Sequence, residues 1–163
     1  MRIVVLSDTH GDFRGFYRIV NDQAGADLFL FLGDGARELE EIRDLYPDKK
    51  ILSVKGNCDL GSPDPEEAVC MAGEKKILFT HGHMLGVDRS DERLLDFARA
   101  SRAQVALYGH THVARIHYEN GVYLMNPGSV SKPREGGPSY GILDITPAGI
   151  VPNIVPLGIS PQK

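Results

Sequence analysis

The chain has 163 residues, of which 42% are hydrophobic and 25% are charged, and its formal net charge is −4. This length favours one domain over residues 1–163 with a core that needs no disulfides, and the composition excludes a disordered, collagen-like or coiled-coil chain. The acidic balance argues against nonspecific binding to nucleic acid or membranes, and no apolar run approaches the roughly 20 residues that span a bilayer.

The chain contains two cysteines, Cys58 and Cys70. The first apolar stretch already begins at Ile3, which leaves no room for a cleaved signal segment before it. We therefore expect both cysteines to be free thiols in a cytoplasmic protein.

The first sixty residues alternate between predicted strands and predicted helices. The unbroken apolar run from Ile3 to Leu6 is typical of a strand that is covered on both faces. Asp12 can cap a helix that extends to about Asp22, and Pro47 ends a second helix. The expected order is strand 3–6, helix 12–22, strand 27–32, helix 37–46 and strand 50–54. This alternation predicts parallel βαβ units.

After a loop at residues 61–65, the pattern changes to strands that form hairpins. We expect strands over 67–71 and 75–80, a helix over 91–100, a strand over 104–107, and later hairpin strands over 113–118, 121–125, 140–145 and 150–155. Seven of the ten prolines fall in residues 127–163, which is consistent with turns and edge strands.

Five of the predicted strands end on polar sequence flanked by glycine, and five of the six histidines lie at these ends. The residues are Asp8, His10, Asp34, Asn57, His81, His83, His110 and His112. In an open α/β fold the carboxyl ends of the strands share one edge, and ligands bind there. We therefore expect these residues to converge on one crevice.

The residue types in this set suit two metal ions. A mixture of imidazole, carboxylate and amide oxygen favours Mn, Fe, Ni or Zn over a calcium cage or a thiolate zinc site. Paired ions about 3.5–4 Å apart can bind both a nucleophilic hydroxide and a phosphoryl oxygen.

Five short motifs occur at the strand ends in order along the chain. They are Asp8-Thr9-His10, Gly33-Asp34, Gly56-Asn57-Cys58-Asp59, His81-Gly82-His83 and Gly109-His110-Thr111-His112. Together they resemble the five blocks of the calcineurin-like metallophosphoesterase superfamily. Asn126-Pro127-Gly128-Ser129, followed by closing strands, also resembles the small prokaryotic phosphodiesterase branch of that superfamily. The resemblance implies an α/β fold, namely a four-layer α/β/β/α sandwich of two mixed β-sheets flanked by helices, and a dinuclear phosphoesterase.

The resemblance also implies which residues hold which ion. One ion would be held by Asp8, His10, Asp34 and His112, and the second by Asp34, Asn57, His81 and His110, so that Asp34 bridges the two. The expected cofactors are two divalent transition-metal ions, with Mn preferred and Ni, Fe or Zn also possible. Asp34, Asn57 and His83 are the expected catalytic residues, although His83 could instead support the site or only pack beside it.

One position departs from the superfamily pattern. Phosphomonoesterases of the superfamily often carry a histidine directly after the asparagine, as a general acid or phosphate contact, and here that residue is Cys58. A neutral thiol donates a proton poorly at pH 7, which favours phosphodiesters or activated esters as substrates. Asp59 is left without an assigned role, because the histidine that it would orient is absent.

The predicted function is that of a dinuclear-metal-dependent phosphodiesterase, in which a metal-activated hydroxide attacks a small phosphodiester or nucleotide in line. One alternative is a phosphomonoesterase or nucleotidase of the same fold, and another is a non-catalytic protein-interaction scaffold. Scaffolds of this fold typically lose several ligands, whereas every inferred ligand position here is filled. A nuclease is disfavoured by the acidic balance, no membrane partner is expected, and a homo-oligomer is left open.

Overall fold

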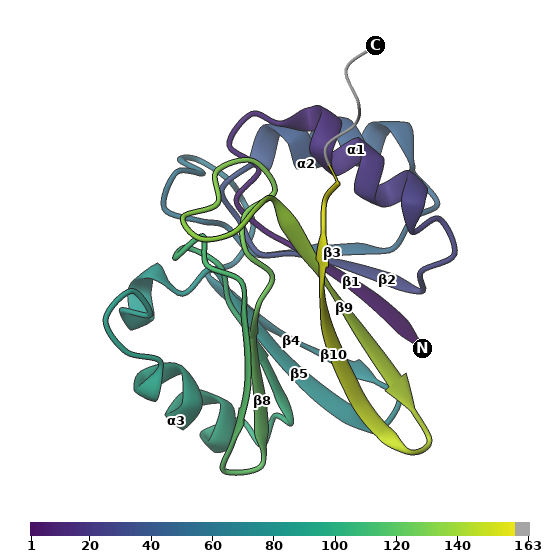
Figure 1. The fold of residues 1–163 in the computed structure, drawn as a ribbon. Helices are drawn as coiled ribbons and strands as arrows, with labels where there is room; N and C mark the ends of the chain where they lie inside the picture. The colour runs from purple at the N-terminus through teal and green to yellow at the C-terminus, as the bar shows by residue number, and fades with distance from the viewer. Residues whose placement is uncertain (159–163) are drawn as a thin grey trace.

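Two mixed five-stranded sheets lie face to face and carry helices on their outer faces in the computed structural model, which describes residues 1–158 (Figure 1). The first sheet contains β1 (Arg2–Leu6), β2 (Leu28–Phe31), β3 (Ile51–Ser53), β9 (Ser139–Thr146) and β10 (Gly149–Pro156). The second contains β4 (Glu67–Ala72), β5 (Lys75–Thr80), β6 (Val105–Leu107), β7 (Arg115–Glu119) and β8 (Val122–Asn126). The helices are α1 (Phe13–Asp22), α2 (Ala36–Leu45), α3 (Glu92–Ala100) and the short 3₁₀ turn η1 (His83–Leu85).

The first sheet has the strand order β10-β9-β1-β2-β3. Its β1, β2 and β3 pair in parallel, which confirms the predicted βαβ units. The last hairpin returns to this sheet, because β9 pairs with β1 antiparallel and places Leu143 opposite Ile3. The first sheet therefore combines strands from both ends of the described chain.

The second sheet has the order β4-β5-β6-β8-β7 and combines two antiparallel hairpins with a parallel centre. Asn120 and Gly121 connect β7 to β8 with positive φ angles of 49° and 84°, as a tight hairpin turn requires. The predicted hairpins are confirmed, and the element ends differ from the expected ones by at most two residues, in either direction.

Helix α1 begins where the sequence predicts. The Asp12 carboxylate accepts a hydrogen bond from the backbone N–H of Gly15 at 2.9 Å, so this side chain is the helix cap. Phe16 and Ile19 of α1 are fully buried against the outer face of the first sheet. None of the helices within residues 1–158 is long and apolar enough to cross a bilayer.

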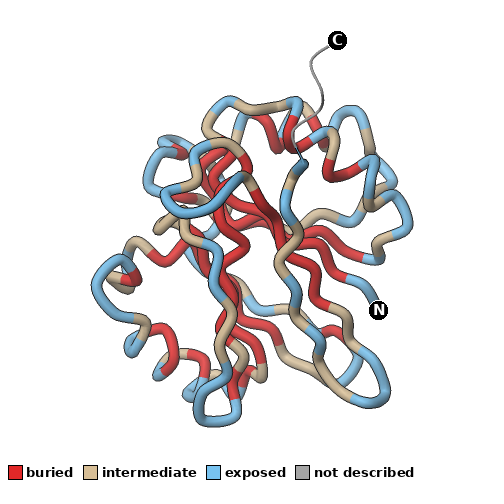
Figure 2. Tube along the Cα trace, in the orientation of Figure 1, coloured by how far each residue is buried: buried red, intermediate tan, exposed pale blue. Residues whose placement is uncertain are grey.

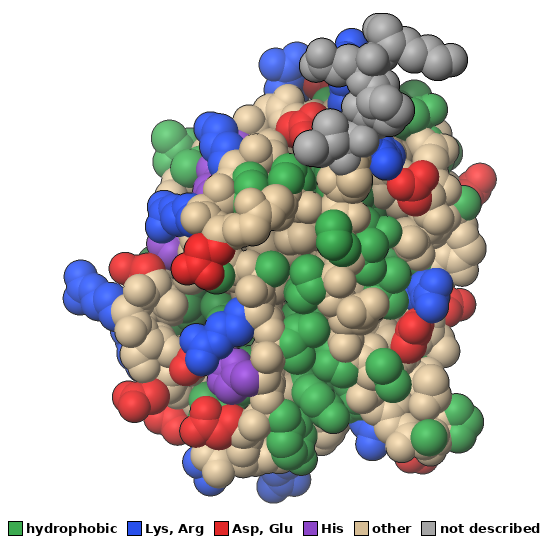
Figure 3. All heavy atoms as spheres, viewed as in Figure 1, with side chains coloured by type: hydrophobic (Ala, Val, Ile, Leu, Met, Phe, Trp, Pro, Cys, Tyr) green, Lys and Arg blue, Asp and Glu red, His purple; other side chains and the backbone are tan. Residues whose placement is uncertain are grey.

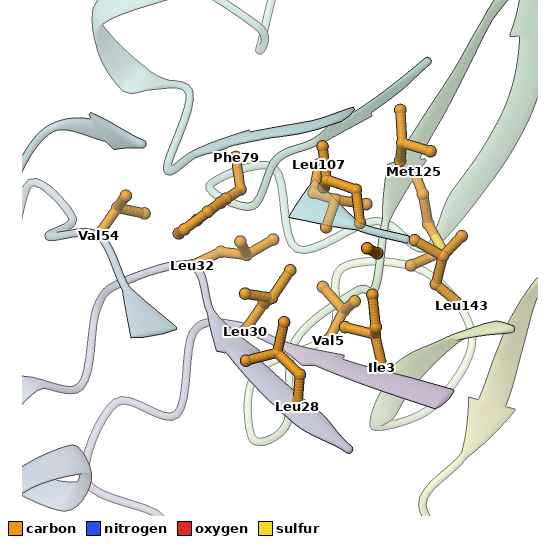
Figure 4. Close-up of a cluster of buried hydrophobic side chains, with 13 residues drawn as sticks. Ile3, Val5, Leu28, Leu30, Leu32, Val54, Phe79, Leu107, Met125 and Leu143 are labelled. Carbon is orange, nitrogen blue, oxygen red and sulfur yellow. The ribbon is translucent and has the colours of Figure 1, made fainter. Parts of the chain in front are cut away.

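The side chains of β1 point alternately to the two faces of the first sheet, and this explains why the sheet is covered on both faces. Ile3 and Val5 point into the space between the two sheets, whereas Val4 and Leu6 pack under α1 and α2. Figure 4 shows Ile3 and Val5 of β1 and Leu28 and Leu30 of β2 among the side chains that fill the inter-sheet core. Helix α3 covers the outer face of the second sheet through a third cluster. Figure 2 shows that the inner strands β1 and β2 are buried, whereas the edge strand β10 is not. The predicted four-layer α/β/β/α sandwich is confirmed.

Apolar side chains reach the surface on the face seen in Figure 3, where they gather over β10 and its neighbours. Tyr118 of β7 and Val151 of β10 are among the exposed large apolar residues. Pro152 and Pro156 lie in β10, which is an edge strand of the first sheet, as the proline pattern predicts.

Candidate metal centre

The loops that follow five strands meet at one end of the sandwich and carry the predicted constellation. Strands β1, β2 and β3 of the first sheet and β5 and β6 of the second each lead into one of these loops. The expectation of a single sheet edge is therefore too simple. Because the two sheets pack face to face, side chains from both reach the same space.

The backbone is strained at most of the predicted ligands. Asp8, His10, Asp34, His110 and His112 have φ angles of 57°, 41°, 59°, 68° and 58°, in the left-handed region that non-glycine residues rarely adopt. Only two other non-glycine residues in the described part of the chain share this conformation. Strain of this kind persists where the surrounding structure enforces it, typically at functional sites.

Asp8 lies at the centre of a first group of donor atoms. Its Oδ1 is 3.1 Å from His112 Nε2 and 3.6 Å from His10 Nε2. The two imidazole Nε2 atoms are themselves 3.1 Å apart. These three side chains can offer one atom each to a single ion.

Asn57 lies at the centre of a second group. Its Oδ1 is 3.1 Å from His81 Nε2 and 3.0 Å from His110 Nδ1. The second sheet supplies both histidines, since His81 follows β5 and His110 follows the strand β6.

Asp34 lies between the two groups. Its Oδ2 is 3.7 Å from His10 Nε2 and 3.4 Å from His81 Nε2. Its Oδ1 accepts a hydrogen bond from the backbone N–H of Cys58 at 2.8 Å. The structure therefore brings all seven predicted metal ligands into one cluster, with the Asp34 carboxylate in the middle.

Backbone carbonyls fix the orientation of two of the imidazoles. His81 Nδ1 lies 2.7 Å from the carbonyl of Leu32, and His112 Nδ1 lies 2.7 Å from the carbonyl of Lys132. A carbonyl can only accept, so each Nδ1 carries the proton and each Nε2 is left with a lone pair that faces the carboxylates. This is the arrangement in which metal-binding histidines are usually held.

The charges in the cluster suit bound cations. Asp8 is fully buried, and its Oδ1 has no hydrogen-bond partner. Burial disfavours the charged form of Asp8, but the imidazoles of His10 and His112 hold its pKa below the usual range. Burial also opposes protonation of His81, but the carboxylates of Asp34 and Asp8 raise its pKa. Two ionised, desolvated carboxylates surrounded by imidazole nitrogens fit divalent ions, which would occupy the place that protons on the imidazoles otherwise take.

His83 lies beside the cluster rather than within it. Its ring centroid is 5.4 Å from that of His81 and 6.1 Å from that of His110. Its Nε2 is 3.7 Å from the Glu66 carboxylate, and its Nδ1 is buried without a partner. Burial and the neighbouring His81 lower the pKa of His83, so the ring is held in its neutral form.

Asp59 holds the loop that carries Asp34. One carboxylate oxygen accepts the backbone N–H groups of Asp34 and Gly56 at 2.7 and 2.8 Å. The other accepts those of Gly35 and Ala36, both at 2.9 Å, at the N-terminus of α2. The sequence left this residue without a role, because three of the four backbone groups lie 23 to 25 residues away and leave no local pattern.

Two serines also position the centre. The Ser7 hydroxyl donates to Asp8 Oδ2 at 2.6 Å. The Ser129 hydroxyl donates to the carbonyl of Asp8 at 2.8 Å, so the segment Asn126-Pro127-Gly128-Ser129 supports the first ligand. Ser129 belongs to a motif that the sequence singled out without a role for this residue, whereas no sequence pattern singled out Ser7.

The remaining residues considered in the sequence lie elsewhere or act through their backbone. His117 is a half-buried residue of β7. Its Nε2 lies 3.3 Å from the Asp91 carboxylate, and it contacts none of the predicted ligands among the ion pairs of the described residues. Cys58 is exposed as a residue, but partial desolvation of its thiol and the nearby Asp34 carboxylate raise the pKa of that thiol. Cys70 is also a free thiol, as expected.

The fold and the cluster together define an α/β/β/α protein with a carboxylate–histidine metal centre. A family profile described as the calcineurin-like phosphoesterase superfamily domain matches residues 1–147. The chain is 32% identical to the probable metallophosphoesterase YsnB of Bacillus subtilis over 89% of this chain and 85% of that protein. It is 31% identical to the phosphodiesterase YfcE of Escherichia coli K12 over 88% of each chain.

A solved structure agrees with these sequence matches. The crystal structure of a conserved uncharacterized protein from Streptococcus pneumoniae, a predicted phosphoesterase, superposes with a TM-score of 0.84 at 31% identity, covering 96% of this chain and 89% of that one. The chain therefore belongs to the calcineurin-like phosphoesterase superfamily, as its motifs predicted, and is an enzyme of the phosphoesterase class.

Proposed function

We propose that the chain is a dinuclear-metal-dependent phosphodiesterase that hydrolyses small phosphodiesters or nucleotides by in-line attack of water. The observation that carries this proposal is the position of Asp34. Its Oδ2 lies within 3.7 Å of His10 Nε2 in one group of donors and within 3.4 Å of His81 Nε2 in the other. A carboxylate in this position can serve two ions at once.

The donor atoms support the ligand division implied by the resemblance to the superfamily. Asp8, His10, Asp34 and His112 would hold one ion, and Asp34, Asn57, His81 and His110 the other. The proposed ions are Mn, with Ni, Fe or Zn as substitutes, because imidazole and carboxylate accept all four. When bound, such a pair supplies a water of lowered pKa and positive charge for the phosphoryl oxygens.

The chain's own residues would prepare the reaction in three ways. The carbonyls of Leu32 and Lys132 keep His81 and His112 in the tautomer that presents Nε2 to the centre. Asp34 and Asn57 fix the relative position of the two donor groups. His83, which is neutral and lies beside His81 and His110, would contact a phosphate oxygen.

Cys58 is the reason for proposing diesters rather than monoesters. It lies beside Asp34, and partial desolvation and that carboxylate raise the pKa of its thiol, so it is a weak proton donor to a leaving group. Ester arms that leave without protonation, such as aryl groups, should therefore react best.

The experiment compares bis(4-nitrophenyl) phosphate with 4-nitrophenyl phosphate, which share a leaving group, using protein loaded with Mn or Ni. We expect a higher kcat/KM for the diester and no turnover after removal of the metal by a chelator. A clear preference for the monoester would favour the phosphomonoesterase alternative. Metal analysis of the purified protein tests the scaffold alternative, since a scaffold need not retain two ions.

The expected surroundings of the enzyme form part of the same proposal. Both cysteines, Cys58 and Cys70, are free thiols, which agrees with a reducing, cytoplasmic location. The substrate would be a small phosphoester rather than nucleic acid, in keeping with the net charge of −4.

A further inference from the structure

A pocket of about 330 Å³ opens directly beside His10 and Asp34. Its lining continues from the metal centre across the first turn of α2 to the loop that follows β3, and includes Ala36, Arg37 and Leu60. A cavity of about 150 Å³ is enough to hold benzene. The pocket can therefore accept a ring that is attached to a phosphoryl group at the metal centre.

The buried polar groups that line the pocket are already engaged. The carboxylate of Asp59 accepts four backbone N–H groups. Glu38 is buried, and its Oε2 accepts the hydroxyl of Thr9 at 3.0 Å. Asp59 therefore has little hydrogen-bonding capacity left for a sugar or another hydroxyl-rich group.

The outer wall of the pocket is apolar and open. Leu60 is 94% exposed, more than any other large apolar residue among those described. A single exposed leucine needs no explanation by itself, but this one lines a pocket that joins the metal centre. The exposed thiol of Cys58 lines the same pocket.

Arg37 completes the wall with a flat cation. Its side chain is 87% exposed, and its Nε lies 3.0 Å from Glu41 on the next turn of α2. A guanidinium that is held by a neighbouring carboxylate can stack on an aromatic ring without losing that pairing.

We propose that this pocket selects one planar, aromatic ester arm of the substrate, with Leu60 as the specificity-determining residue. The ring packs on Leu60 and stacks against Arg37, while the phosphoryl group lies at the metal centre. This assignment rests on the proposed phosphodiesterase function, and it narrows the substrate class to aryl or nucleobase-bearing phosphoesters.

The test measures binding of two probes, phenyl phosphate and methyl phosphate, to the Mn-loaded protein by calorimetry. They carry the same phosphate and differ only in the arm. We expect the natural protein to bind phenyl phosphate about tenfold more tightly, since the ring buries several additional apolar carbons. Leu60→Asp should bring the ratio close to one and leave the affinity for methyl phosphate within about twofold.

Two control variants make the result specific. Leu60→Met keeps an apolar side chain and should keep the ratio. Leu45→Asp introduces the same charge at another exposed leucine, 56% exposed at the far end of α2, and should also keep it. Because Leu60 is almost fully exposed, its replacement does not threaten the fold.

Two results would overturn the assignment: equal binding of both probes by the natural protein, or an unchanged ratio in Leu60→Asp. Either can occur in a protein that hydrolyses diaryl phosphates well, in which case the proposed function stands and only the pocket assignment is lost. Failure to hydrolyse any diester would instead overturn the proposed function. The relative affinity for phenyl phosphate and methyl phosphate is measured independently of that result.

Discussion

Replacing Asp59 by alanine removes the carboxylate that connects the Asp34 loop, the Gly56 backbone and the start of α2. This carboxylate accepts N–H groups from four residues at 2.7 to 2.9 Å. Only 9% of Asp59 is exposed, so water cannot easily take its place. The variant should lose both folding stability and affinity for metal.

The magnitude follows from which N–H groups stay buried. The N–H of Ala36 is only partly buried beside the pocket at α2, so water can reach it when the acceptor is lost. The N–H groups of Asp34, Gly35 and Gly56 are buried. At about 1–3 kcal/mol for each of these three unsatisfied groups, the free energy of unfolding should fall by about 3 kcal/mol or more. Loss of this support for Asp34 should also weaken Mn binding by about 10–100-fold.

The assay is urea unfolding of the metal-free protein together with Mn titration of the folded protein. Asp12→Ala is the matched control, because Asp12 also caps a helix but accepts only one N–H, that of Gly15. Asp12→Ala should lower the free energy of unfolding by about 1 kcal/mol and leave the Mn affinity unchanged. If Asp59→Ala is no less stable than Asp12→Ala and binds Mn normally, Asp59 does not position the centre and the reasoning is refuted.

Three further substitutions and one pH dependence test other parts of the structure. Asp34→Asn should lower Mn stoichiometry and reduce diester hydrolysis by more than the 10–100-fold typical of supporting residues, measured by metal analysis and steady-state kinetics; retention of two ions would contradict a bridging role. Gly56→Ala would place a Cβ 2.0 Å from Asp34 Oδ1, so the loop must shift, with a stability cost of about 1–3 kcal/mol and weaker Mn binding. Leu30→Ala, at a fully buried inter-sheet position, should cost about 2–5 kcal/mol in urea unfolding without changing the metal content of the folded protein. The hydrogen bond and charge of Arg2 lower the pKa of Asp144, so this pair stabilises the fold above the unfolded carboxyl pKa of about 3.9. That small stabilisation should disappear as the pH falls through the folded pKa, and the unfolding difference between the natural protein and Asp144→Asn should shrink accordingly.

The sequence by itself predicted the elements and the residues of the centre. The run from Ile3 to Leu6 predicted a strand covered on both faces, because burial of a strand leaves a continuous apolar signature. Asp12 predicted the start of α1, because an N-cap needs only its own helix. The polar strand ends predicted the ligands, and the resemblance to a known superfamily supplied the four layers and the division between two ions.

The tertiary structure decided what depends on residues that are remote in sequence. The pairing of β9 with β1 joins Leu143 to Ile3, and no local pattern specifies that partner. The same holds for the contacts of Asp59 with Asp34, Gly35 and Ala36 and for the carbonyl of Leu32 that orients His81. Local sequence patterns indicate which segments are buried and where turns occur. Contacts between residues that are distant in sequence depend instead on how the two sheets pack together. For this reason the pocket at Leu60 could be found only in the folded chain.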